Sequence, residues 1–180
     1  DTMVLVTAVV ASNERNVDFF PLTVDVEAGM YAAGKIPGGF IKREGRASDH
    51  SILNARLIDR PIRPLWPKGF NRETHIVATV LSVDKKNPYD VLAVVGASAA
   101  LCISQAPFAG PVGAVRVAKV DGSWVINPTY EEIDKSPVNL VVAGTAEAIG
   151  MVEAGCEEVD EADMLAGLQV AHEEIKRQVE

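Results

Sequence analysis

The chain has 180 residues, of which 48% are hydrophobic and 23% are charged, and its formal net charge is −8. This length and composition predict one folded domain with a core of its own, and they exclude a chain that is disordered over long stretches. No run of residues approaches the ~20 apolar positions that a membrane-spanning helix requires, so we expect no membrane partner.

The two cysteines, Cys102 and Cys156, form no C-x-x-C pattern. We therefore expect both to be reduced and buried, as in an intracellular protein. The chain opens at Asp1 directly on a strand-like pattern, so we expect it to be a fragment.

Two strands are expected before the main concentration of positive charge. Met3–Ala11 is a continuous run of apolar and β-branched residues, which is typical of a strand buried on both faces. Phe20–Val26 predicts a second strand. Pro21 near its start favours a place at an edge or an end of the sheet, because proline cannot donate a ladder hydrogen bond.

Positive charge is concentrated between Lys35 and Arg72, where nine of the 17 Lys and Arg residues stand against three acidic residues. The local net charge is therefore +6 in a chain of net charge −8. An acidic protein that gathers its cations in one place usually presents them to an anion. The alternative is that these cations pair with carboxylates of the same chain, as charges on solvated surfaces often do.

A helix is expected inside this basic region. Ser48 is its predicted N-cap, and Asp49 follows in the first turn, where the helix dipole favours a carboxylate. The apolar residues that recur near helical spacing predict its buried face: Ile52, Leu53, Leu57 and Ile58. Arg56 and Arg60 are four residues apart and leave one side of this helix. Pro61 disfavours helical geometry at the residue before it, so the helix should end at about Arg60.

The second half of the chain predicts strands in clusters separated by helices. The expected strands are 75–83, 112–120, 123–126, 139–144 and 148–153, and the expected helices are 89–104 and 160–180. Asp121-Gly122 is a hairpin signal between two of the strands. The small residues from Gly96 to Ala100 should let their apolar helix lie close to a sheet. This order indicates an α+β or layered fold rather than strict βαβ repetition.

No catalytic constellation emerges from the residues alone. The acidic residues between Glu157 and Asp163 open a predicted helix, where the dipole favours them, so we do not interpret them as metal ligands. No Cys or His set has the spacing of a zinc site. Asp59 lies between Arg56 and Arg60, and we expect it to hold an arginine in place rather than to act as a base.

Three segments stand in the order that a known family shows: FFPLTVDVEAGMYAAGKIPGGFIKREGRASDHSILNARLIDRPIRPLWPKGF, VGASAALCISQAPFAGPVGAVRV and LVVAGTAEAIGMVEA. With them, residues 1–180 resemble the first RNase PH-like core domain of the bacterial polynucleotide phosphorylase family. The resemblance implies an RNase PH-like (ribosomal protein S5 domain 2-like) layered domain of sheets and helices. It also implies that the first strands of the core and the later domains (helical linker, second core, KH and S1) are missing.

The resemblance further implies an activity. Enzymes of this family are phosphorolytic 3′→5′ exoribonucleases that degrade single-stranded RNA with inorganic phosphate and release nucleoside diphosphates in mRNA turnover. They require Mg²⁺ or Mn²⁺, and they assemble as homotrimers with RNA threaded through a central channel. Partners in an RNA-degradation complex and a cytoplasmic location, or an organellar one for a homologue, are implied in the same way.

The family pattern assigns roles to individual positions. Phe40, Lys42, Arg43 and Arg46 match the channel loop that grips RNA, although Ile41 replaces the second Phe of that loop and Lys42 lacks the planar fork of Arg. Arg56 and Arg60, with Arg63 close by, match arginines that face the active site and contact RNA or phosphate. Catalytic and metal-binding residues are expected in the second core and none in this stretch.

Two alternatives remain open from the sequence. The chain could be a self-sufficient RNase PH-like exonuclease, although no carboxylate cluster accompanies its arginines. It could also be a purely structural ring subunit whose arginines form salt bridges between subunits.

Overall fold

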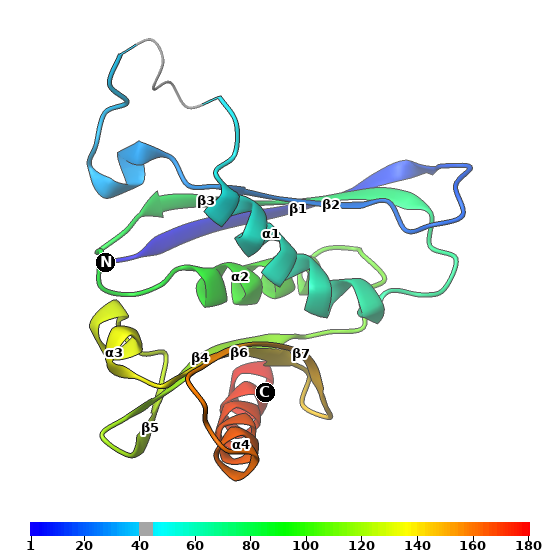
Figure 1. Cartoon of the computed structure of the whole chain (residues 1–180). Helices are drawn as coiled ribbons and strands as arrows, with labels where there is room; N and C mark the ends of the chain where they lie inside the picture. The colour runs from blue at the N-terminus through cyan, green and yellow to red at the C-terminus, as the bar shows by residue number, and fades with distance from the viewer. Residues whose placement is uncertain (40–44) are drawn as a thin grey trace.

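The computed structural model describes residues 1–39 and 45–180. Its elements form four layers: a three-stranded sheet, a pair of helices, a four-stranded sheet and an outer helix (Figure 1). The predicted α+β layered fold is confirmed. No helix in the described part of the chain is long and apolar enough to cross a membrane.

The first sheet, sheet A, is built from β1 (Met3–Glu14), β2 (Leu22–Glu27) and β3 (Arg72–Ser82) in the order β1-β3-β2. Strand β3 pairs antiparallel with β1 and parallel with β2. A single-turn 3₁₀ helix, η1 (Met30–Ala33), follows β2. Both β1 and β2 are therefore edge strands among the described residues.

The second layer holds α1 (Asp49–Ile62), which continues into the 3₁₀ turn η2 (Arg63–Leu65), and α2 (Asp90–Cys102). Both helices lie between the two sheets in Figure 1. Val94, Ala97 and Leu101 of α2 are almost fully buried in the core that both helices share with sheet A. The prediction of an apolar, buried helix over this segment is confirmed.

The second sheet, sheet B, has the strand order β5-β4-β6-β7 and is antiparallel throughout. Its strands are β4 (Gly113–Val120), β5 (Ser123–Ile126), β6 (Val138–Gly144) and β7 (Ile149–Cys156). The turn at Asp121-Gly122 has positive φ at both residues, as the hairpin signal predicts. Helix α3 (Tyr130–Lys135) joins β5 to β6, and α4 (Glu161–Val179) covers the outer face of the sheet (Figure 1).

The prediction that the first strand is buried on both faces is wrong. Burial alternates along β1, and Met3, Leu5 and Val9 are exposed, the last two to 52% and 64%. The inward residues pack on the helices, whereas no described element covers the outer face of sheet A. An apolar run without polar alternation thus marks a strand whose outer face is apolar and bare.

Helix α1 differs from its prediction in two respects. It runs through Pro61 to Ile62, with the buried proline in its last turn, and the chain then tightens directly into η2. Its buried face is also rotated from the predicted one. Ile52 and Leu53 are 41% and 60% exposed, and the buried residues are Ser51, Asn54, Ile58, Pro61 and Ile62.

The cysteines form no disulfide, as expected, but both are exposed rather than buried. Cys102 is the last residue of α2, and Cys156 is the last residue of the edge strand β7. Each cysteine therefore lies at the end of an element, outside the packed core, and is exposed although cysteine is usually buried.

Gly96 allows α2 to approach β1. A Cβ at this position would lie 2.6 Å from Cγ2 of Val6.

We predict that Gly96→Ala lowers the free energy of unfolding by about 1–3 kcal/mol through overpacking, even though alanine favours a helix by about 1 kcal/mol. Urea denaturation measures the change.

The matched background is Val6→Ala, which removes the methyl group in question. In that background Gly96→Ala should be neutral or stabilising, because only the helix propensity of alanine remains. Equal destabilisation in both backgrounds would show that this contact does not set the distance between the helix and the sheet.

Candidate nucleic-acid interface

The candidate site is a groove between α1 and the outer edge of β2. Ser48 caps α1 by accepting a hydrogen bond from the backbone N–H of Ser51, as the sequence predicts. The helix then carries its arginines along β2 towards η2. The groove has a volume of about 370 Å³ and is lined by residues 22–26 of β2 and by Ala47, Ser51, Ile52, Ala55, Arg56, Asp59 and Arg63.

Arg63 ties the end of α1 to the start of β2. Its Nε and Nη2 donate to the two carboxylate oxygens of Asp59 at 2.9 and 2.6 Å. Its Nη1 donates to the carbonyl oxygen of Phe20 at 3.1 Å, and Nη2 donates to that of Leu22 at 3.2 Å. The guanidinium also lies 5.7 Å from the centre of the Phe20 ring. Asp59 therefore holds an arginine in place, as expected, and that arginine is Arg63.

Phe20 belongs to an aromatic cluster that supports this end of the groove. Its ring centre lies 4.7 Å from that of Trp66 and 5.6 Å from that of Phe70. Phe108 adds a fourth ring at 6.2 Å from Trp66. These side chains come from three separate stretches of the chain. They fix the loop before β2 against the segment that follows α1, so Arg63 has a rigid base.

Arg60 points to the other sheet. Its guanidinium forms an ion pair with Glu153 of β7, and Nη2 donates to the carbonyl oxygen of Val152 at 3.4 Å. Both charged side chains are about half exposed, which limits the net free energy of such a pair to roughly 1 kcal/mol. Arg60 is therefore partly neutralised and remains open to solvent.

Arg56 differs from both neighbours. It lines the groove from the middle of α1, and within residues 1–39 and 45–180 it makes no hydrogen bond or ion pair. A fixed helix thus presents at the groove a guanidinium that has no partner among the described residues, beside a second guanidinium that Asp59 orients. Such planar forks match phosphate oxygens in a bidentate manner.

The structure brings only some of the predicted residues together. Arg56 and Arg63 share the groove, and Arg60 lies one turn further along α1, facing β7. Arg46 is exposed in the segment before the helix. Phe40, Lys42 and Arg43, which were predicted to grip RNA, lie outside the described residues.

No metal site accompanies the arginines in the described ranges. Among residues 1–39 and 45–180, no group of three or more His, Cys, Asp and Glu side chains could hold a metal ion.

One pair of charged residues was missed by the sequence reasoning. Arg116 of β4 and Asp90 of α2 form an ion pair in which the side chains are only 13% and 9% exposed. A signal for it exists, because Arg116 stands between the apolar residues Val115 and Val117 of β4, and a buried charge needs a partner. The ion pair lines a second pocket of about 430 Å³, between α2 and β4.

Comparison with known families gives the class of the protein. A model described as the 3′ exoribonuclease family, domain 1, matches residues 1–107, and a model of domain 2 of the same family matches residues 110–174. The chain therefore belongs to the 3′ exoribonuclease family. The first match covers sheet A with α1 and α2, and the second covers sheet B with most of α4.

Two relatives show which proteins of this family the chain is similar to. The chain is 62% identical to the polyribonucleotide nucleotidyltransferase of Syntrophomonas wolfei, covering 100% of this chain and 26% of that protein. It is also 62% identical to that of Moorella thermoacetica, covering 98% of this chain and 24% of the relative. The chain thus spans about a quarter of the curated relatives and resembles their first RNase PH-like core.

A solved structure supports the fold. A chain of the structure described as "archaeoglobus fulgidus exosome with RNA bound to the active site" has a TM-score of 0.74 and 18% sequence identity. The match covers 98% of this chain and 78% of that one. The four-layer arrangement is therefore an RNase PH-like fold, as predicted.

The two arginines of the groove should differ in their effect on stability. We predict that Arg63→Ala lowers the free energy of unfolding by about 1–2 kcal/mol, because it frees two backbone carbonyls and Asp59. Arg56→Ala should change it by less than about 0.5 kcal/mol. Urea denaturation of both variants measures this difference, and equal losses would contradict it.

Proposed function

We propose that this chain is the RNA-gripping first core of a phosphorolytic 3′→5′ exoribonuclease, which degrades single-stranded RNA with inorganic phosphate to nucleoside diphosphates. The observation that carries the proposal is the Arg56 groove: a helix-mounted guanidinium without a described carboxylate partner, beside a second one that Asp59 and two carbonyls hold in place. Membership of the 3′ exoribonuclease family and the named relatives support it.

The charge distribution fits this role. A single-stranded polyanion needs cations along its path and no sequence-specific contacts. The net charge of −8 then keeps most of the surface acidic, while nine of the 17 Lys and Arg residues gather in the region that contains α1. Positive charge is needed only along the path of the RNA, and the rest of the surface can remain acidic.

Catalysis is assigned to a second core outside this chain. Phosphorolysis brings two anions together, and arginine clamps with a metal ion meet that requirement. The described residues provide the clamps without a metal-binding group. In the whole enzyme, Mg²⁺ or Mn²⁺ would be held by residues elsewhere, and inorganic phosphate would be the co-substrate that Arg56 and Arg60 help to bind.

Ring assembly is the second part of the proposal. The outer face of sheet A exposes Met3, Leu5, Val9 and Leu81. An apolar face of this kind marks a protein contact, and we assign it to a neighbouring core domain in a homotrimeric ring. We infer a cytoplasmic location or, in an organelle of bacterial descent, the equivalent compartment. RNA-degradation partners would bind the assembled enzyme.

Binding of single-stranded RNA tests the groove directly. We predict that Arg56→Ala lowers the affinity of the chain for a fluorescent oligoribonucleotide by about three- to tenfold, with a salt slope smaller by about one, because one phosphate contact is lost. Fluorescence anisotropy at several salt concentrations measures both quantities.

Arg177→Ala is the matched control, since it removes the same charge from α4, where Arg177 pairs with Glu174. It should leave RNA affinity unchanged. Equal losses in the two variants would mean that binding depends on net charge and not on the groove. If Arg56→Glu abolished self-association while RNA affinity stayed the same, a purely structural ring subunit would be the correct interpretation.

Phosphorolysis by the 180-residue chain tests where the chemistry lies. With a labelled oligoribonucleotide, Mg²⁺ and inorganic phosphate, we expect no release of nucleoside diphosphates, because the described residues offer no metal-binding group. Thin-layer chromatography of the products measures this. Phosphate-dependent release would establish a self-sufficient exonuclease instead.

A further inference from the structure

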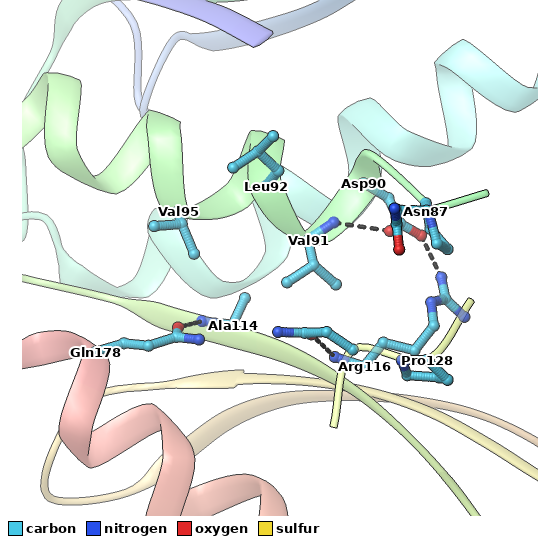
Figure 2. A pocket seen from close by; sticks show the side chains of 11 residues that line it. Asn87, Asp90, Val91, Leu92, Val95, Ala114, Arg116, Pro128 and Gln178 are labelled. Carbon is cyan, nitrogen blue, oxygen red and sulfur yellow. Dashed lines mark hydrogen bonds and ion pairs between the residues drawn. The ribbon is translucent and has the colours of Figure 1, made fainter. Parts of the chain in front are cut away.

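A second pocket lies between α2 and β4, away from the arginine groove. Its volume is about 430 Å³. In Figure 2, Val91 and Val95 of α2 stand above Ala114 and Arg116 of β4, with Gln178 at one end and Asn87 and Asp90 at the other. The groove described above lies between α1 and β2, so the two sites belong to different layers.

The charges of this pocket are already compensated. The Nη2 of Arg116 donates to one carboxylate oxygen of Asp90, and Nη1 donates to the side-chain oxygen of Asn139. The other carboxylate oxygen of Asp90 accepts from the N–H of Val91 at 2.8 Å. An anionic ligand would have to displace a buried carboxylate from its arginine, which is costly. The pocket therefore favours an uncharged group.

The floor of the pocket is the edge of β4 beyond its ladder with β5, which runs only from Val117 to Val120. The backbone N–H of Asn127 still donates to the carbonyl of Arg116 at 2.7 Å, whereas no described strand lies beside Ala114 on this edge. Two side-chain amides cap it. Gln178 accepts from the N–H of Ala114 at 3.0 Å, and Asn127 accepts from the N–H of Arg116 at 3.1 Å.

These caps leave hydrogen-bonding capacity at the pocket. Each amide uses its oxygen, so the NH₂ groups of Gln178 and Asn127 remain as donors without a described partner. The pocket thus carries two amide donors along one side.

The far rim adds an acceptor in a rigid turn. The side-chain NH₂ of Asn87 donates to Asp84 at 2.6 Å, which leaves the amide oxygen of Asn87 available. Hydrogen bonds from the backbone N–H groups of Asn87 and Lys86 hold the pKa of the Asp84 carboxyl well below its usual range. Asp84 is therefore ionised at neutral pH, and the turn keeps its shape.

The opposite wall is apolar. Val91 and Val95 are one helical turn apart on α2, and Leu92 of the same helix also lines the pocket. Pro128, which is buried, lines it beside Arg116 (Figure 2). An apolar wall that faces two amide donors, with an amide oxygen at the rim, suits a planar heterocycle, whose faces are apolar and whose edge carries alternating polar groups.

The geometry points to a nucleobase-binding site between α2 and β4, which takes the purine of a nucleoside with its face on Val91 and Val95 and its edge on Gln178 and Asn127. This site requires nothing of the arginine groove, so it stands or falls separately from the proposed function. The base can come from a free nucleoside or from an RNA strand.

Adenosine is the probe, because it carries a purine but no phosphate that could bind the arginines. We expect saturable binding of adenosine to the 180-residue chain, weaker binding of uridine and none of ribose. Val95→Phe, which fills the pocket, and Gln178→Ala, which removes a donor, should each lower adenosine affinity at least fivefold. Isothermal titration and saturation-transfer NMR measure these affinities, and circular dichroism verifies that each variant is folded.

Arg56→Ala is the control and should leave adenosine affinity unchanged. Two results overturn the site: no saturable binding of adenosine at millimolar concentration, or a folded Val95→Phe variant that binds adenosine as the parent chain does. The source of the base follows from an oligoribonucleotide titration. Weaker RNA binding by Val95→Phe places an RNA base in the pocket, and unchanged RNA binding leaves free nucleosides as its ligands.

Discussion

The burial of α2 between two sheets is the constraint on which the rest of the structure depends. This helix has no polar side to offer to water, so it folds only when sheet A covers one face and sheet B the other. Gly96 brings it within van der Waals distance of Val6. Because α1 packs beside α2 in the same layer, its orientation follows, and its polar side is left facing the edge of β2.

The orientation of α1 gives its arginines different partners and therefore different roles. Arg63 satisfies backbone carbonyls and a carboxylate, and Arg60 spans to β7, whereas Arg56 is left without a described partner. All three arginines carry the same charge and lie within about two helical turns of one another, so charge alone does not distinguish them. Their partners do. Asp59 lies on the same helix as the arginines, whereas the backbone carbonyls and Glu153 come from segments far away in the sequence. A cluster of cations is thus part scaffold and part recognition surface.

Local signals predicted much of the architecture. The hairpin at Asp121-Gly122, the cap at Ser48 and the apolar helix around Gly96 are each determined by neighbouring residues, and all three were predicted correctly.

Two of the errors concern which face of a helix or strand is covered by other elements. Ile52 and Leu53 look like core residues, and β1 looks buried on both sides, because an apolar surface awaiting a partner has the same pattern as an interior. Helix α3 was missed although Thr129 and Glu132 form a capping box. The arginine positions came from the family resemblance, and the Arg116–Asp90 pair needed the fold.

The bond from Arg63 to the carbonyl of Leu22 also bears on solubility. Pro21 gives its carbonyl to Thr74 in the sheet, so the carbonyl of Leu22 points to the open edge of β2. A bare edge is a template on which strands of other molecules can add and aggregate. Because a charged side chain already occupies this acceptor, an incoming strand would have to displace it before pairing could start at that end. The residue that anchors α1 therefore also shields β2 from edge-to-edge aggregation.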